Sequence, residues 1–157
     1  FIVNVMGREC GDIAMRVGLA SGADAIVIPE RHYDIKAIAE TLKQGFADGK
    51  DHGLVVLAEG VMEAEDFKNE LLKYGDFDAR GNVLGHMQRG GSPTVEDRVN
   101  ATKMGNYAVN LLLDGKGGLA VGMENGQPNT HDILDLFDGK HQGDYSLLDV
   151  NEEMTKN

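Results

Sequence analysis

Side chains that could hold an anion gather in the stretch from Gly85 to Thr94, which reads Gly-His-Met-Gln-Arg-Gly-Gly-Ser-Pro-Thr. His86 and Arg89 supply imidazole and guanidinium donors, and the glycine pair that follows lets backbone N–H groups approach a ligand closely. Pro93 stands near the first position of a predicted long helix, and helix N-termini attract anions. The stretch is therefore either a site for a phosphate-sized anion or a glycine corner with a solvated arginine and a histidine bonded to backbone.

Three further charged side chains stand beside predicted strands. Arg8, in Met6-Gly7-Arg8, directly follows one strand and is either an anion ligand or a surface residue in a salt bridge. Glu59 ends a wholly apolar run, where a carboxylate accepts hydrogen bonds from ligand hydroxyls or pairs with a cation. Arg80 precedes another strand, where a solvated edge arginine is the ordinary alternative. Cations for a phosphate and a carboxylate for hydroxyls are together what a sugar phosphate needs.

Several well-known catalytic and nucleotide-binding motifs have no counterpart in the sequence. We find no Gly-Lys-Ser/Thr phosphate loop, no paired carboxylates and no Ser/His/Asp spacing. Neither a metal-holding acid nor a base for the attacking hydroxyl can be assigned. The residues by themselves predict a substrate cradle without a nucleotide site.

The predicted elements bring these candidates to one edge of a sheet. Short apolar runs alternate with segments of helical period, which is typical of an α/β lobe with a largely parallel sheet flanked by helices. Strands are predicted at 1–6, 25–29, 54–58, 82–84 and 119–123, and helices at 12–20, 35–47 after an Asp34 cap, 63–73 and 93–113. The tail after Asn125 is predicted to be polar with weak helical stretches. Ligands bind such sheets at the carboxyl ends of the strands, where Arg8, Glu59 and the Gly85–Thr94 stretch lie.

Length and charge limit the class of protein. The 157 residues suit one domain or one lobe of a larger protein, and nothing in the sequence marks an internal boundary. The chain begins with a strand-like run and no initiator methionine, so we expect Phe1 to lie inside a longer chain. A net charge of -11 argues against nucleic acid and anionic membrane as partners.

The cysteine content and hydropathy predict a cellular compartment. Cys10 is the single cysteine, which rules out an internal disulfide and a cysteine-based zinc site and is typical of a reducing compartment. No apolar run approaches the roughly 18 residues of a membrane span. We therefore expect a soluble, cytoplasmic protein.

Four stretches resemble the C-terminal, substrate-binding half of bacterial ATP-dependent 6-phosphofructokinases. They read VMGRECGD, AEG, NVLGHMQRGGSPTVEDR and LLLDGKGGLAVGMENGQ, and the similarity runs from Phe1 to about Ile133. The string Gly-His-x-Gln-Arg-Gly-Gly-Ser-Pro is highly specific to that family. The resemblance implies a phosphofructokinase-type layered lobe over residues 1–157, belonging to a homo-oligomer, a tetramer. It also implies transfer of the γ-phosphoryl of MgATP to the 1-hydroxyl of fructose 6-phosphate in glycolysis.

The resemblance assigns a role to each candidate. The Met6-Gly7-Arg8 segment matches the family's substrate-binding loop, whose arginine also steadies the phosphoryl group in transfer. Glu59 matches the carboxylate that binds sugar hydroxyls, and His86 and Arg89 match residues that hold the 6-phosphate. Arg80 matches an arginine that reaches the same phosphate from a neighbouring subunit.

The family's remaining machinery belongs to its N-terminal half. That half carries the catalytic aspartate, the magnesium ligand and the glycine-rich ATP loop, so we expect ATP and Mg²⁺ to bind mainly outside this chain, with no metal site here. The chain alone is predicted to be inactive. A pyrophosphate-dependent phosphofructokinase and a non-catalytic anion-binding regulatory half stay open as alternatives, although a regulatory site has no need of both Arg8 and Glu59.

The resemblance also implies part of an allosteric site for ADP or phosphoenolpyruvate. The matching positions in this chain are Gly22, Asp24, Lys50 and His52. Asp48 and Asp51 stand where well-regulated relatives often carry lysine or arginine, and Asp24 stands where they have glutamate. Carboxylates in place of cations oppose phosphate binding, so we predict weak or absent effector control unless Asp48 and Asp51 point to solvent around Gly49.

Overall fold

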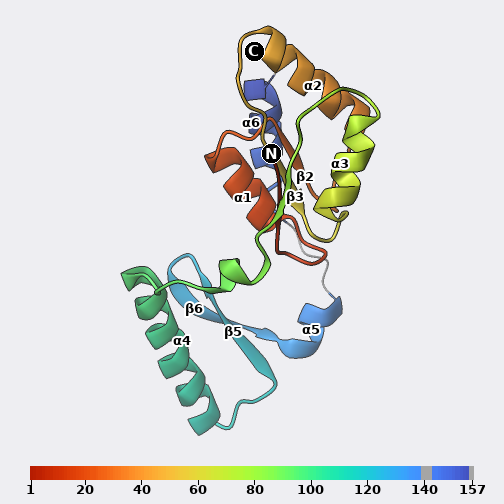
Figure 1. The fold of residues 1–157 in the computed structure, drawn as a ribbon. Coiled ribbons are helices and arrows are strands. Elements are labelled where there is room, and N and C mark those ends of the chain that lie inside the picture. Colours follow the sequence, from red (N-terminus) through yellow and green to blue (C-terminus); the bar gives the residue numbers. More distant parts are fainter. Residues whose placement is uncertain (139–142, 156–157) are drawn as a thin grey trace. The chain divides into compact units, whose positions relative to one another are not determined.

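A computed structural model describes residues 1–138 and 143–155 (Figure 1). These residues form two compact units, one built from residues 1–90 with the described C-terminal residues, the other from the described part of 91–141. The sequence marks no boundary between these units. The boundary falls at the Gly90-Gly91 pair, where Gly91 adopts a φ of +110° that residues with side chains rarely take.

The first unit is built on a four-stranded sheet in which every pairing is parallel. Its strands run in the order β2-β3-β1-β4. They are β1 (Ile2–Val5), β2 (Ala25–Val27), β3 (Val55–Ala58) and β4 (Gly81–Val83). Ile2 pairs with Val55 on one side and with Gly81 on the other. The parallel sheet confirms the prediction and brings the ends of β1, β3 and β4 to one edge.

Helices cover both faces of this sheet (Figure 1). They are α1 (Asp12–Ala20), α2 (Ile35–Ala47), α3 (Ala64–Leu72) and α6 (Ser146–Thr155). On the α2 and α3 face, Phe67 packs with Leu57 in one buried cluster. On the α1 and α6 face, Met15 packs with Val56 and Leu148. Neighbouring residues of β3 thus point to opposite faces, and both faces are apolar, as a covered parallel sheet requires.

Two polar side chains fix helices of the first unit. Asp34 caps α2 as predicted, because its carboxylate accepts a hydrogen bond from the backbone N–H of Lys36 at 2.9 Å. Asn151 of α6 is buried, and its Nδ2 donates to the carbonyl of Ala23 at 2.7 Å. The helix at the end of the chain is therefore tied to the turn that precedes β2.

The second unit contains the longest helix and a two-stranded antiparallel sheet. Its elements are α4 (Val95–Leu113), β5 (Leu119–Glu124), β6 (Gln127–Asp132) and α5 (Ile133–Asp138). A capping box between Thr94 and Asp97 starts α4, so Pro93 lies just before the cap and not at the first helical position. This corrects the predicted start of the helix by two residues.

The strand β6 was not predicted, and β5 pairs with it instead of joining the parallel sheet. Asn125 and Gly126, with φ of +50° and +76°, form the two-residue turn between these strands. The predicted helical stretches of the tail are present as α5 and α6. The parts of the tail at 139–142 and 156–157 lie outside the described residues.

The second unit buries little apolar surface within itself. Leu111 is its one buried hydrophobic residue among those described. By contrast, Leu113 of α4 is 80% exposed and Phe137 of α5 is 81% exposed. Two helices and one hairpin with so little burial leave a large apolar surface exposed on the described residues of this unit.

Candidate functional site

Three loops meet at the carboxyl edge of the parallel sheet. Residues 6–8 follow β1, Glu59 and Gly60 follow β3, and the short 3₁₀ helix η1 (Gly85–Arg89) follows β4. Because β1 lies between β3 and β4, the Met6-Gly7-Arg8 loop has a neighbour on each side. The predicted gathering of polar residues at this edge is confirmed for these three loops.

Glu59 holds the backbone of the loop after β1. Its Oε1 accepts hydrogen bonds from the N–H of Arg8 at 2.8 Å and of Gly7 at 3.1 Å. These two hydrogen bonds lower the pKa of Glu59 below its ordinary value of 4.5, and the bond from Arg8 has the larger effect. The nearby positive charges of Arg8 and Arg89 lower this pKa further. Glu59 therefore stays ionised at neutral pH beside two cations, in a position where its other oxygen can meet a ligand.

The backbone around Arg8 is tightly constrained. Arg8 itself has a φ of +52°, which is uncommon for a residue with a side chain. A Cβ on Gly60 would lie 1.8 Å from the Arg8 carbonyl oxygen, and a Cβ on Gly7 would lie 2.2 Å from that of Cys10. Sequence analysis singled out Gly7 but gave Gly60 no role, although its place beside Glu59 was visible. Gly60 is therefore required for the close approach of the two loops, and Gly7 for the tight turn from Gly7 to Cys10 within the loop after β1.

The His86 to Arg89 segment forms η1, a short helix separate from the long helix α4. A 3₁₀ helix has three residues per turn, so residues three apart lie on the same side. His86 and Arg89 therefore share a face, and both are exposed. Gln88 is half-buried instead, and its Oε1 accepts a hydrogen bond from Met6 N at 2.8 Å. Sequence analysis missed Gln88, because an uncharged side chain inside a charged motif gave no separate signal.

Arg80 lies at the amino ends of the parallel strands, whereas Arg8, Glu59 and Arg89 lie at the carboxyl ends. Its carbonyl accepts a hydrogen bond from Ile2 N at 2.9 Å, at the start of β1, and its side chain is exposed near Asp78. A cavity of about 670 Å³, lined in part by Phe1 and Phe77, opens beside it. Arg80 and Arg8 thus lie at opposite ends of β1.

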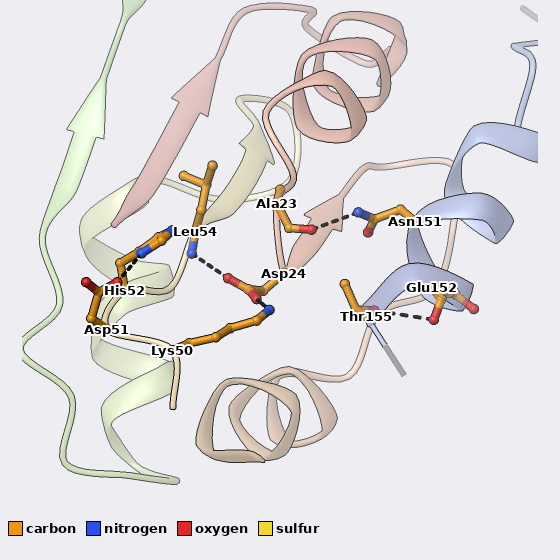
Figure 2. A network of polar contacts seen from close by, with 9 residues as sticks. All are labelled: Ala23, Asp24, Lys50, Asp51, His52, Leu54, Asn151, Glu152 and Thr155. Carbon is orange, nitrogen blue, oxygen red and sulfur yellow. Dashed lines mark hydrogen bonds and ion pairs between the residues drawn. The ribbon is translucent and has the colours of Figure 1, made fainter. Parts of the chain in front are cut away.

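The predicted effector positions Asp24 and Lys50 contact each other within the chain (Figure 2). The Asp24 carboxylate, buried at 7% exposure, accepts from Lys50 Nζ at 2.6 Å and from Leu54 N at 2.8 Å. A cavity of about 280 Å³, lined in part by Asp24, Arg31 and Asn151, opens next to this pair. Asp24 thus ties the loop before β3 to the turn before β2, and it compensates the charge of Lys50.

The other effector positions lie on exposed turns. Gly22 follows α1 with a φ of +67°, and Asp48 caps the end of α2, where both its oxygens accept from Gln44 Nε2. Asp51 is 94% exposed and pairs with His52 Nδ1 at 2.6 Å, and this hydrogen bond lowers the pKa of Asp51 (Figure 2). Asp48 and Asp51 are thus solvated. In this arrangement their charges oppose the binding of an anionic effector less than they would if they pointed into the site.

Within residues 1–138 and 143–155, no three or more His, Cys, Asp or Glu side chains are grouped so that they could hold a metal ion. In the same residues, no helix is long and apolar enough to cross a membrane.

Comparison with known proteins gives consistent matches. A family model for phosphofructokinase matches residues 1–112. The ATP-dependent 6-phosphofructokinase of Lactobacillus acidophilus is 88% identical over 156 residues, and that of Lactiplantibacillus plantarum is 56% identical over 155 residues. The match covers 99% of this chain in each case, but 49% and 48% of the relatives. The chain thus spans about half the length of the curated relatives it matches.

Solved structures show the same fold. The phosphofructokinase of Saccharomyces cerevisiae superimposes with a TM-score of 0.76 at 30% identity, over 86% of this chain and 20% of that one. A pyrophosphate-dependent phosphofructokinase from Nitrosospira multiformis gives a TM-score of 0.65 at 22% identity, over 86% of this chain and 39% of that one. The second likeness is informative about the fold alone.

Proposed function

Because the chain belongs to the phosphofructokinase family, we propose that it forms the fructose 6-phosphate-binding, C-terminal half of an ATP-dependent 6-phosphofructokinase of cytoplasmic glycolysis. The observation that carries this proposal is the meeting of Arg8, Glu59 and Arg89 at one sheet edge. A carboxylate with two guanidinium groups nearby provides acceptors for sugar hydroxyls and donors for phosphates in one region.

Each of these groups has a distinct task in the proposed reaction. Glu59 uses Oε1 on the loop amides, which leaves Oε2 for a hydroxyl of the sugar. His86 and Arg89, on one face of η1, bind the 6-phosphate. Arg8 stabilises the charge that develops on the phosphoryl group in transfer, and the tightly held loop keeps its backbone in place for that task.

The other half of the enzyme supplies the remaining chemistry. MgATP, the metal ligand and the catalytic base are assigned to that half, as the resemblance to the family implies. The exposed apolar side chains of the second unit, such as Leu113 and Phe137, give that half a surface to pack against. Arg80, at the far edge of the sheet, binds the 6-phosphate of a neighbouring copy in a homotetramer.

Effector control of this enzyme is weak. Lys50 is already paired with the buried Asp24, whereas Asp48 and Asp51 are solvated and contribute less to this weakening. A phosphate-bearing effector would have to displace the Asp24 carboxylate from Lys50 before Lys50 could bind it. Titrating the intact enzyme with phosphoenolpyruvate or ADP tests this, because a strong shift in the fructose 6-phosphate saturation curve would contradict it.

A direct test combines the chain with its other half, in one chain or as a separate one. We expect turnover of fructose 6-phosphate with MgATP only in the combination, and turnover by the chain alone would refute the division of labour. Pyrophosphate in place of ATP serves as the second donor, since a pyrophosphate-dependent enzyme would use it. For a non-catalytic anion module, fructose 6-phosphate and inorganic phosphate would raise the melting temperature equally.

A further inference from the structure

Two side chains hold three consecutive backbone N–H groups of the loop after β1. Glu59 accepts from Gly7 and Arg8, and Gln88 accepts from Met6 at 2.8 Å. Glu59 comes from the end of β3 and Gln88 from η1 after β4, so the loop is fastened from both neighbouring strands. Only the oxygen of the Gln88 amide can accept from an N–H group, which fixes how this amide is oriented.

Gln88 stands between the two residues proposed to bind the 6-phosphate. On a 3₁₀ helix, His86 and Arg89 share one side, while Gln88 points about 120° away from them. Met87 points outward at 79% exposure, whereas Gln88 is half-buried. The same short helix therefore presents His86 and Arg89 to solvent and Gln88 to the loop after β1.

We propose that Gln88 is a positioning residue that couples the phosphate-binding helix η1 to the loop carrying Arg8. Its hydrogen bond to Met6 sets the distance between the cations of η1 and the arginine at the transferring group. This inference rests on the proposed phosphofructokinase function. It adds a residue that touches no substrate atom and acts through the backbone of Met6.

The test compares Gln88→Met with the unchanged enzyme, assembled with its other half. Methionine has nearly the shape of glutamine but lacks a strong acceptor, so Met6 N loses its partner. The loss of one neutral hydrogen bond predicts that the KM for fructose 6-phosphate rises about 3- to 10-fold, with the KM for ATP unchanged. Hydrogen–deuterium exchange should speed up at one amide in the peptide covering residues 1–8. Met87→Gln, at the exposed neighbouring position, should change neither quantity.

Three results would overturn the inference. They are an unchanged KM for fructose 6-phosphate, unchanged exchange at residues 1–8, and a fall in kcat and melting temperature with no effect on KM, which marks a merely structural role. If Gln88→Met does not fold, Gln88→Glu keeps the acceptor, so exchange should stay slow while the added charge beside Arg89 weakens fructose 6-phosphate binding. Fast exchange in that variant would also refute the coupling. An unsubstituted assembly that does not turn over fructose 6-phosphate would instead refute the proposed function.

Discussion

Replacing Gly60 by alanine should disable the enzyme by displacing Arg8. The backbone of Gly60 does not have a positive φ, so alanine fits its conformation and the obstacle is purely steric. The new Cβ would lie 1.8 Å from the Arg8 carbonyl oxygen, whereas real Cβ atoms essentially never come closer than 3.0 Å. The two loops must therefore separate by at least about 1.2 Å. The loop that carries Arg8 would then shift, and its amides would move away from the Glu59 carboxylate.

A displacement of this size has a predictable cost. Misplacing a catalytic group by about 1 Å lowers the rate roughly 10²-fold, so we expect kcat/KM for fructose 6-phosphate to fall by about that factor. The assay is steady-state turnover of the complete enzyme with varied fructose 6-phosphate. Overpacking should also lower the free energy of unfolding by about 1–3 kcal/mol, which denaturant unfolding measures separately.

Gly105→Ala serves as the matched control. Gly105 lies inside α4, and a Cβ there meets no atom within 4 Å. Alanine at this helix position should raise stability by about 0.5–1 kcal/mol and leave turnover unchanged. If Gly60→Ala keeps kcat/KM within about threefold of the unchanged enzyme while folding normally, the placement of Arg8 does not depend on this contact and the argument fails.

Other positions give simpler predictions. Asp24→Ala leaves the N–H of Leu54 without its acceptor and should destabilise the protein by about 1–3 kcal/mol in urea unfolding, more than Asp24→Asn; equal effects would contradict this. Phe67→Ala empties the core beneath α3, and a loss below about 3 kcal/mol would be unexpected. Because the folded pKa of Glu59 is lowered, its stabilisation is present above pH 4.5 and is lost as pH falls through the lower folded value, and an NMR titration should find that value below 4.5. Thr94→Ala removes the capping box and should cost about 1 kcal/mol, seen as reduced helicity in circular dichroism.

Local patterns predicted the parts of the fold that depend on them. The apolar run of β3 and the Asp34 cap of α2 lie where periodicity and capping preferences put them. The hairpin of β5 and β6 was missed because Pro128 and its polar neighbours do not resemble a strand, although Asn125-Gly126 is a strong hairpin signal. The boundary after Gly90 depends on contacts between segments far apart in the sequence, which no local pattern reports.

The charged residues of the site could be predicted from the sequence, but the residues that hold its loops in place could not. Arg8, Glu59 and Arg89 were singled out because charged groups at strand ends carry a chemical meaning of their own. Gln88 and Gly60 matter through one backbone hydrogen bond and one close contact. Such relations join segments far apart in the sequence, so they become visible only when the loops are seen side by side.

The central claim is that η1 binds the 6-phosphate of the sugar. The most direct measurement is the KM of the complete enzyme for each substrate after Arg89→Ala. Losing a charge-assisted contact should raise the KM for fructose 6-phosphate by about 10- to 100-fold and leave the KM for ATP nearly unchanged. A comparable rise for both substrates, or for neither, would contradict the account and reduce the Gly85–Thr94 stretch to a glycine corner.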